Sequence, residues 1–351
     1  MIFPTLETPA VLVDLDVAEA NIDRFQAYCD KHHLALRPHI KTHKLAFLAH
    51  RQLAAGAVGV TCQKVSEAEA MVADGGIEDV LITYNIIGED KLKRLRALAQ
   101  RVKLSVVADN ELTIQGLTAA FATAPEPLRV LVECDTGAGR CGVQTPEAAD
   151  NLAQLINEAP GLSFGGLMTY PPVGREADVE AWLRVAKQQI EAGGTPVPVI
   201  SNGGSPGMWR AHEVPVATEY RIGTYVYFDR SLVTHGTCKL DDCALTVLAS
   251  VVSVPTEGRA VIDAGSKVLT SDLLGLEGYG HVIGRPDVTI ASLSEEHGVL
   301  HAENIAMKVG DRLRVVPNHA CVVSNMMDEV QLVRNGKLQG PTPVTARGTV
   351  Q

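Results

Sequence analysis

Features that would place this chain in a membrane or on nucleic acid are missing. No apolar run approaches the roughly 20 residues that cross a bilayer, and the start of the sequence lacks the basic residues and the apolar core of a signal peptide. No block of basic residues occurs, and a formal charge of -10 with a pI near 5.6 disfavours a nucleic-acid surface. We therefore expect neither a membrane nor a nucleic-acid partner.

Cysteine pairs typical of disulfide or metal frameworks are also missing. The seven cysteines are scattered through 351 residues, and no Cys-x-x-Cys pair occurs. This predicts reduced thiols in a cytoplasmic protein, most of them small core residues. With 46% hydrophobic residues, the chain can bury one large domain and a smaller one.

Strand-like and helix-like segments alternate through the first two thirds of the chain. Eight such units in about 220 residues predict an α/β fold, a (β/α)8 TIM barrel. A doubly wound open sheet would carry a glycine fingerprint after its first strand, and none is present. The predicted barrel strands lie at residues 9–15, 34–41, 59–62, 79–84, 103–109, 129–135, 162–170 and 197–201.

The alternation of strand-like and helix-like segments ends after about Asp229. Short runs rich in Val and Ile, separated by turn residues, predict a smaller all-β domain. Asn335-Gly336 between two such runs is typical of a two-residue hairpin. We place the barrel at residues 9–230 and the β domain at residues 231–351, with residues 1–8 added to it.

A basic octet, residues 37–44, follows the second predicted strand. Because side chains alternate along a strand, Arg37, His39 and Lys41 are expected to share one face. Positive neighbours and burial favour the neutral amine of lysine, the form that condenses with an aldehyde. A solvated basic turn is the alternative interpretation.

Two glycine turns follow the last predicted strands. Gly203 and Gly204 come after Ser201, and Gly223 precedes Thr224 and Tyr225. Glycine lets backbone N–H groups close on phosphate oxygens, although each turn alone is more often an ordinary turn. A lysine and a phosphate site at one barrel mouth together favour a phosphorylated aldehyde, pyridoxal phosphate.

His319 and Cys321 form a second motif that indicates chemistry, in this case a metal site. At positions i and i+2 after a strand, an imidazole and a thiolate can point the same way and bind one divalent ion. Two protein ligands leave positions for water and substrate, as a catalytic metal requires. A buried thiol beside a surface histidine is the alternative from these two residues alone.

Eight motifs carry a family resemblance, and they occur in order along nearly the whole chain. They are residues 8–14, 37–44, 62–68, 133–143, 221–225, 263–267, 296–298 and 317–321. In these motifs the chain resembles the D-threonine aldolase/D-serine dehydratase family of fold-type III pyridoxal-phosphate enzymes. The resemblance implies an alanine-racemase-like barrel with a β domain, usually as a homodimer.

The resemblance also implies roles for single residues. Lys41 corresponds to the Schiff-base lysine, Arg140 to a contact of the cofactor's 3'-oxygen, and Tyr170 to a neighbour of its ring nitrogen. In the family the positions of His319 and Cys321 hold the metal. A thiolate with an imidazole favours zinc over the harder magnesium or calcium, and manganese or magnesium is the alternative ion. Further cofactor contacts are expected from His39, Gln63, Ser201, Gly203, Gly204, Gly223, Thr224 and Tyr225.

The implied substrate is a small D-β-hydroxy-α-amino acid. The leading prediction is a D-threonine aldolase, which yields glycine and acetaldehyde. The alternative is a zinc-dependent D-serine or D-3-hydroxyaspartate dehydratase. The cysteine ligand at position 321 resembles these zinc enzymes more than it resembles the aldolases. Residues 171–175 lack the loop histidine of comparable aldolases. His297 is therefore the candidate catalytic base for the β-hydroxyl, with a structural histidine as the alternative.

Other classes of protein stay open. An amino-acid racemase would use a tyrosine of the β domain and no metal, and a non-catalytic pyridoxal-phosphate-binding protein would not need His319 and Cys321. A metal-dependent barrel hydrolase would need several carboxylate or histidine ligands at strand ends, where only scattered ones occur.

Overall fold

The computed structural model describes residues 3–351, which divide into two compact units. The barrel unit comprises Phe25–Lys41, Ala46–Gly223 and Thr349–Gln351, and the β unit comprises Met1–Arg24, Thr42–Leu45 and Thr224–Gly348. Helix α1 (Leu15–Lys31) has residues in both. Among residues 3–351, no helix combines the length and the apolar character that crossing a bilayer requires.

Eight parallel strands form the sheet of the barrel unit, in the order β2-β9-β8-β7-β6-β5-β4-β3. The two ends of this order also meet, because Leu36 O accepts a hydrogen bond from Val58 N (2.9 Å) and Pro38 O accepts one from Thr61 N (2.7 Å). The predicted barrel class is confirmed. The strands are β2 (Ala35–Leu36), β3 (Val60–Cys62), β4 (Asp79–Ile82), β5 (Lys103–Ala108), β6 (Leu128–Cys134), β7 (Leu162–Thr169), β8 (Ile200–Gly203) and β9 (Glu219–Arg221).

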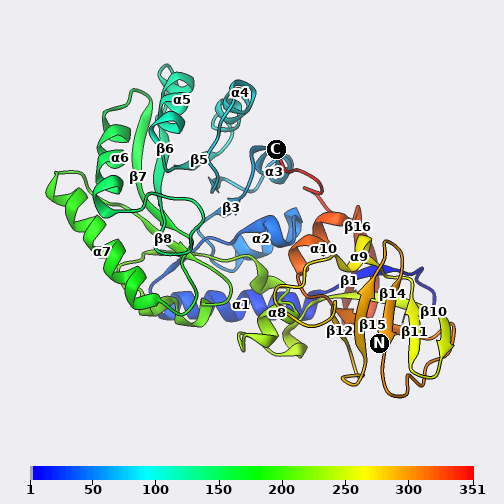
Figure 1. The fold of residues 1–351 in the computed structure, drawn as a ribbon. Helices are drawn as coiled ribbons and strands as arrows, with labels where there is room; N and C mark the ends of the chain where they lie inside the picture. Colours follow the sequence, from blue (N-terminus) through cyan, green and yellow to red (C-terminus); the bar gives the residue numbers. More distant parts are fainter. Residues whose placement is uncertain (1–2) are drawn as a thin grey trace. The chain divides into compact units, whose positions relative to one another are not determined.

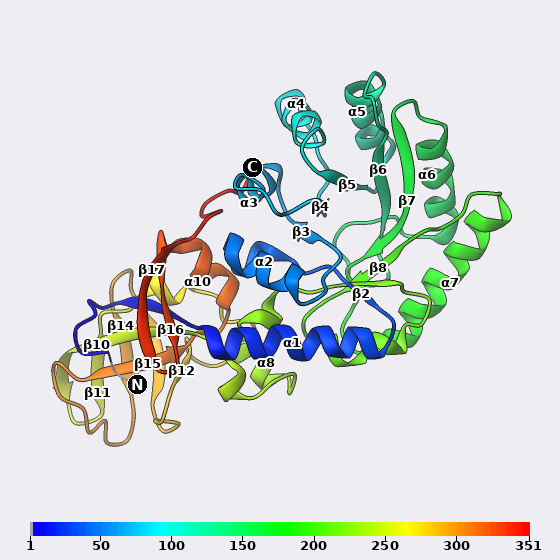
Figure 2. The same cartoon turned by 180° about the vertical axis from the view of Figure 1, so that it is seen from behind.

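Helices cover the outside of this sheet (Figures 1 and 2). Local sequence explains where several begin. The Asn110 side chain accepts from Thr113 N at the start of α5, and Thr145 caps α6 with Pro146 at its first position. The helices are α2 (Ala46–Ala54), α3 (Val65–Met71), α4 (Glu89–Leu98), α5 (Glu111–Phe121), α6 (Pro146–Glu158) and α7 (Glu176–Ala192).

Buried charges run through the interior of the barrel. Arg37 pairs with Glu219 (Nε to Oε2, 2.7 Å) and with Asp79 (Nη1 to Oδ1, 2.6 Å). The Ser201 hydroxyl donates to Glu219 (2.6 Å) and accepts from Arg221 Nε (2.8 Å). Because charges removed from water need partners, this network explains why the short polar strand β9 belongs to the barrel.

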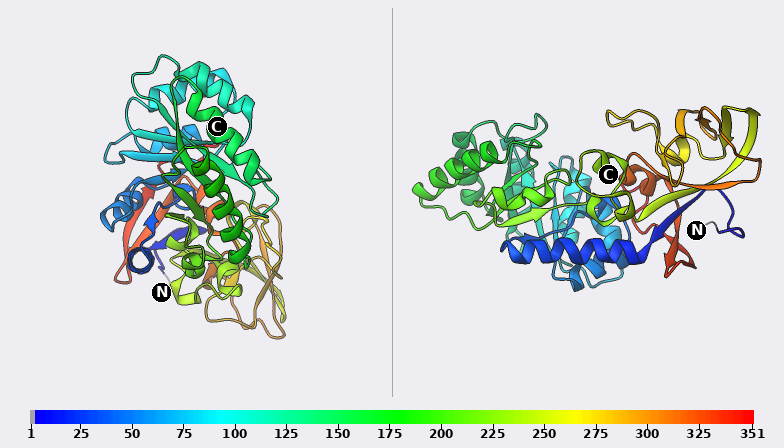
Figure 3. Two further views of the ribbon diagram at one scale, coloured as in Figure 1. Left: turned by 90° about the vertical axis from the view of Figure 1, so that its left-hand side faces the viewer. Right: turned by 90° about the horizontal axis from the view of Figure 1, so that it is seen from below.

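The sequence prediction missed β9 and placed one strand in the wrong sheet. Residues 10–14, predicted as the first barrel strand, form β1 (Ala10–Asp14), which pairs antiparallel with β10 and parallel with β16 in the β unit. Figure 3 shows this N-terminal strand, in blue, among the yellow-to-red strands. Its apolar pattern fits either sheet, whereas its partner strands lie more than two hundred residues further along the chain.

The β unit is mostly antiparallel, as predicted for an all-β domain. The turn at Asn335 (φ 48°) and Gly336 (φ 72°) is the predicted two-residue hairpin. The other strands are β10 (Leu245–Thr256), β11 (Arg259–Ile262), β12 (His281–Val282), β13 (Thr289–Leu293), β14 (Gly298–His301), β15 (Arg312–Val316), β16 (Glu329–Arg334) and β17 (Lys337–Pro343). Short helices lie between them, including α8 (Arg230–Thr234), α9 (Ser266–Leu269) and α10 (Ala320–Met326).

His39 lies where the barrel closes, bridged to Thr61, and its ring is buried. The Gln63 amide nitrogen donates to Thr83 O (2.9 Å), so its amide oxygen faces His39 Nε2 (3.1 Å) and accepts the proton there. Burial, together with the charge of Lys41, holds the pKa of His39 well below its ordinary value of 6.5. His39 is therefore a neutral ring with its proton on Nε2.

Acidification should destabilise the wild-type protein more than a His39→Gln variant. The unfolded chain protonates His39 near pH 6.5, whereas the buried ring stays neutral, so below this pH the unfolded state binds more protons. Each pH unit below about 6.5 should remove up to about 1.4 kcal/mol from the free energy of unfolding. Denaturant titrations from about pH 7.5 to 5 measure the difference between the two proteins. Equal pH dependence would show that the folded ring takes up a proton.

Candidate active site

Lys41 lies in a turn of 3-10 helix, η1 (Ile40–Thr42), just after the residue that closes the barrel. The prediction of a strand through Lys41 is wrong, because β2 ends at Leu36 and Pro38 has no N–H to donate to a neighbouring strand. Arg37 is also not the cationic neighbour that was predicted, since two carboxylates neutralise its charge. The half-buried Lys41 therefore stands on a tight turn anchored by the neutral His39.

Arg140 and Tyr170 lie together at the carboxyl ends of β6 and β7. The Arg140 guanidinium carbon sits 4.4 Å from the centre of the Tyr170 ring, and Nη2 lies 3.8 Å from Glu133 Oε1. Burial raises the pKa of Glu133, while Arg140 and Arg221 oppose this rise. The predicted pair is thus brought together, with both side chains partly exposed.

The first glycine turn is closely packed. A Cβ at Gly203 would lie 2.0 Å from Arg221 O, and Gly204 has φ +147°, a conformation that L side chains rarely adopt. The N–H of Gly203 donates to Asn202 Oδ1 (2.9 Å), and that of Gly204 donates to Arg221 O (3.1 Å). Glycine is required at this turn by the approach of β8 to β9, and the phosphate role stays a prediction.

The remaining predicted cofactor contacts lie deep in their units. The Ser201 side chain is fully buried, and its hydroxyl is bound to Glu219 and Arg221. Tyr225 is also fully buried, and it lies with Thr224 in η3 (Thr224–Val226) of the β unit. Their side chains therefore serve packing and internal hydrogen bonds in this structure.

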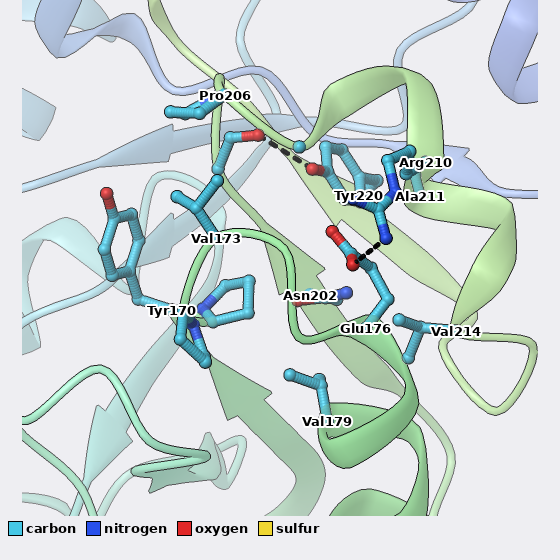
Figure 4. A pocket seen from close by; sticks show the side chains of 14 residues that line it. Tyr170, Val173, Glu176, Val179, Asn202, Pro206, Arg210, Ala211, Val214 and Tyr220 are labelled. Carbon is cyan, nitrogen blue, oxygen red and sulfur yellow. Dashed lines mark hydrogen bonds and ion pairs between the residues drawn. The ribbon is translucent and has the colours of Figure 1, made fainter. Parts of the chain in front are cut away.

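A pocket lies beside the first glycine turn (Figure 4). Within it Arg210 forms an ion pair with Glu176 (Nη2 to Oε2, 2.5 Å), and the Tyr220 hydroxyl donates to Gly204 O (2.7 Å). Figure 4 shows the Tyr170 ring turned away from this ion pair. The contact of Tyr220 with Gly204 thus ties this pocket to the first glycine turn.

His319 and Cys321 are brought together in the β unit, where His319 occupies the N-cap position of α10 and Cys321 lies in its first turn. The two side chains lie close enough for each to shift the pKa of the other. Burial opposes the charge on His319, but hydrogen bonds to Asp229 and Cys321 raise its pKa to about 10. Burial likewise opposes the thiolate, yet His319 and two hydroxyl groups lower the pKa of Cys321.

The two hydroxyl groups belong to Thr42 and Thr224. Thr42 Oγ1 lies 3.1 Å and Thr224 Oγ1 lies 3.6 Å from Cys321 Sγ. A thiolate stabilised by hydroxyl groups, beside an imidazole, is a donor set that suits zinc. Residues 3–351 contain no cluster of three or more such ligands. These two residues thus fit a metal ion that keeps open positions for water and substrate.

His297 lies apart from these groups. It is exposed in the turn between β13 and β14, where its ring faces Ser294 (Nδ1 to Oγ, 3.5 Å) and its carbonyl accepts from Ser294 N. Among residues 3–351, no hydrogen bond or ion pair joins His297 to His319 or Cys321. Its role as the base stays a prediction without geometric support.

Sequence reasoning missed Thr42 and Asp229. Thr42 directly follows Lys41 in the chain, which was the only available signal for it. Asp229 accepts a hydrogen bond from His319 Nδ1 (3.2 Å to Oδ2) but lies ninety residues away in sequence. Neither contact follows from the spacing of the predicted motifs.

Comparisons with known proteins agree over nearly the whole chain. Residues 13–231 match the alanine racemase N-terminal domain family, and residues 244–333 match the putative serine dehydratase domain family. The D-threonine aldolase of Arthrobacter sp. is 35% identical over 98% of this chain and 93% of that protein.

Solved structures show the same relationship. The D-threonine aldolase of Filomicrobium marinum superposes with a TM-score of 0.92 at 34% identity, covering 99% of this chain and 97% of that one. The D-threo-3-hydroxyaspartate dehydratase of Delftia sp. HT23 gives 0.88 at 30% identity, with coverages of 97% and 98%. A metal-free variant of a D-threo-3-hydroxyaspartate dehydratase gives 0.87 at 30% identity, also with coverages of 97% and 98%. The chain therefore belongs to the D-threonine aldolase/D-serine dehydratase family of alanine-racemase-like pyridoxal-phosphate lyases.

Proposed function

We propose that this chain is a pyridoxal-phosphate- and divalent-metal-dependent lyase that cleaves D-β-hydroxy-α-amino acids, with D-threonine as the aldol substrate. One observation carries the proposal. Cys321 lies beside His319 and its thiol contacts Thr42, which is the residue that follows Lys41 in the chain. This donor pair, together with relatives named D-threonine aldolase, supports a lyase in which Lys41 serves the α-carbon and the metal pair serves the β-oxygen.

When bound, pyridoxal phosphate supplies an electron sink for the substrate α-carbon, and the metal ion supplies a Lewis acid for the β-oxygen. Lys41 would hold the cofactor's aldehyde carbon and then carry protons to and from the α-carbon. His319 and Cys321 would hold the metal ion. The open positions that two ligands leave are those at which a hydroxyl oxygen can enter.

Groups on the barrel unit would orient the cofactor. Arg140 would face its 3'-oxygen and Tyr170 its ring nitrogen, and the cation–π contact between these two side chains would hold them in place. The turns at Gly203, Gly204 and Gly223 would approach the phosphate through their backbone. A tyrosine instead of an arginine near the ring nitrogen would leave the electron demand of the cofactor adjustable.

The dehydratase is the second candidate, and Cys321 is the observation that favours it. In that route Lys41 removes the α-proton and hydroxide leaves the β-carbon. In the aldolase route a base removes the proton of the β-hydroxyl and the Cα–Cβ bond breaks. Because His297 is exposed in its turn, the base of the aldolase route is not assigned among residues 3–351. A homodimer and a cytoplasmic location are further proposals, supported only by the family resemblance and by the cysteine pattern.

Replacing Lys41 should abolish the yellow colour of the purified protein. The Lys41→Ala variant has no amine to hold the cofactor, so the absorbance of lysine-bound pyridoxal phosphate should vanish. Lys93→Ala is the matched control, because Lys93 is exposed and pairs only with Glu89 on the same helix. Borohydride reduction followed by peptide mapping should label Lys41 alone in the wild-type protein. A label on another lysine would contradict the assignment.

Removing the metal should stop turnover but leave the colour unchanged. Treatment with a chelator is expected to abolish consumption of D-threonine, and added zinc should restore it, because the metal acts on the β-oxygen while Lys41 holds the cofactor. Full activity in protein that is free of metal would contradict the lyase proposal and favour a racemase.

The products distinguish the two routes. Acetaldehyde and glycine from D-threonine would support the aldolase, whereas a keto acid and ammonia would support the dehydratase. Both are measured in one reaction with the wild-type protein.

A further inference from the structure

Asp229 occupies the N-cap of α8 and is almost completely buried, with 1% of its surface exposed. Its Oδ1 accepts a hydrogen bond from Leu232 N (3.1 Å), as an N-cap residue does. A cap needs only this one oxygen. The second oxygen is therefore available for another task.

The second oxygen of Asp229 binds the metal-site segment. Oδ2 accepts from Ala320 N (3.2 Å) and from His319 Nδ1 (3.2 Å). Because a carboxylate has no proton to donate, the imidazole proton in this contact is on Nδ1. The other ring nitrogen, Nε2, is then left for a metal ion or for the neighbouring thiol of Cys321.

The two segments are also tied together on either side of this contact. Arg230 N donates to Pro317 O (3.0 Å), and Arg230 Nη1 donates to Asn318 Oδ1 (3.0 Å). The start of α8 and residues 317–320 thus form one hydrogen-bonded assembly. Asp229 is held at a fixed position relative to the His319 ring.

We propose that Asp229 is a positioning residue that fixes the proton of His319 on Nδ1 and aims Nε2 at the divalent ion shared with Cys321. The inference rests on the proposed metal function of His319 and Cys321. Metal-bound histidines commonly donate their other N–H to a carboxylate, which sets the ring orientation and strengthens the ligand. Here the same carboxylate also caps a helix, so ligand orientation is coupled to the fold of residues 229–234.

The Asp229→Asn variant tests the proton position. If the asparagine oxygen keeps the cap on Leu232, its amide nitrogen faces His319 and donates to Nδ1, which moves the ring proton to Nε2. The affinity of the cofactor-loaded full-length protein for zinc should fall about 10- to 100-fold. Competition with a chromophoric chelator measures this affinity, and the absorbance of the bound cofactor should not change.

A second variant separates capping from positioning. Asp229→Ser keeps a good N-cap side chain but is too short to reach His319, so zinc affinity should fall while the helix cap is preserved. It also serves if Asp229→Asn does not fold. Thr145→Ala is the matched control, because it removes an equivalent cap from α6 in the barrel unit and should leave zinc affinity unchanged.

A double-mutant cycle decides whether Asp229 acts through His319. In a His319→Ala background, Asp229→Ser should cause no further loss of zinc affinity, because the ring that it orients is gone. An equal loss in both backgrounds would overturn the inference and leave Asp229 as a general structural residue. If the Asp229 variants bind zinc as tightly as the wild-type protein, the inference is also overturned. The proposed metal site of His319 and Cys321 would then still stand. Wild-type protein that binds no zinc through His319 and Cys321 would instead overturn the proposed function, and the inference with it.

Discussion

The hydrogen bond between Thr42 and Cys321 is the contact on which the proposed chemistry depends. It spans 3.1 Å between Oγ1 and Sγ and connects residues 279 positions apart. Thr42 follows Lys41 directly in the chain, and both residues belong to the turn of 3-10 helix at residues 40–42. The residue that contacts the thiol and the predicted cofactor lysine are therefore neighbours in the sequence.

Three of the predicted residues are held in place by contacts that the fold itself requires. The neutral state of His39 follows from its burial and its hydrogen bond to Gln63, and the position of Arg37 follows from its two carboxylate partners. The orientation of His319 follows from Asp229. Buried polar groups must be paired to be tolerated, so the same pairs that keep the fold stable also keep the reactive side chains in place.

The fold was largely predictable because parallel buried strands leave continuous apolar runs and because helix starts carry caps. Helix α6 begins at the proline that follows the cap of Thr145, where the sequence places it. The strand at residues 10–14 could not be assigned to a sheet, because its pairing with β10 and β16 depends on residues far along the chain. The three residues of β9 were missed, because two of them, Glu219 and Arg221, are charged and a charged pattern does not predict a buried strand. Their burial becomes understandable only from their partners inside the barrel.

The candidate site was predictable only in part. Lys41, His319 and Cys321 stand in recognisable motifs, and the last two lie close enough to shift each other's pKa. Two residues that contact the metal pair, Thr42 and Asp229, were not singled out by any motif. Their roles follow only from contacts between segments that lie far apart in the sequence. His297 shows the opposite case, a motif residue that the fold places on an exposed turn.

Anomalous diffraction at the zinc edge from crystals of the cofactor-loaded protein tests the central claim most directly. We predict a single strong peak bound by His319 Nε2 at about 2.0–2.1 Å and by Cys321 Sγ at about 2.3 Å, together with continuous electron density from Lys41 to the cofactor. Crystals that contain zinc elsewhere and none at these two residues would contradict the account.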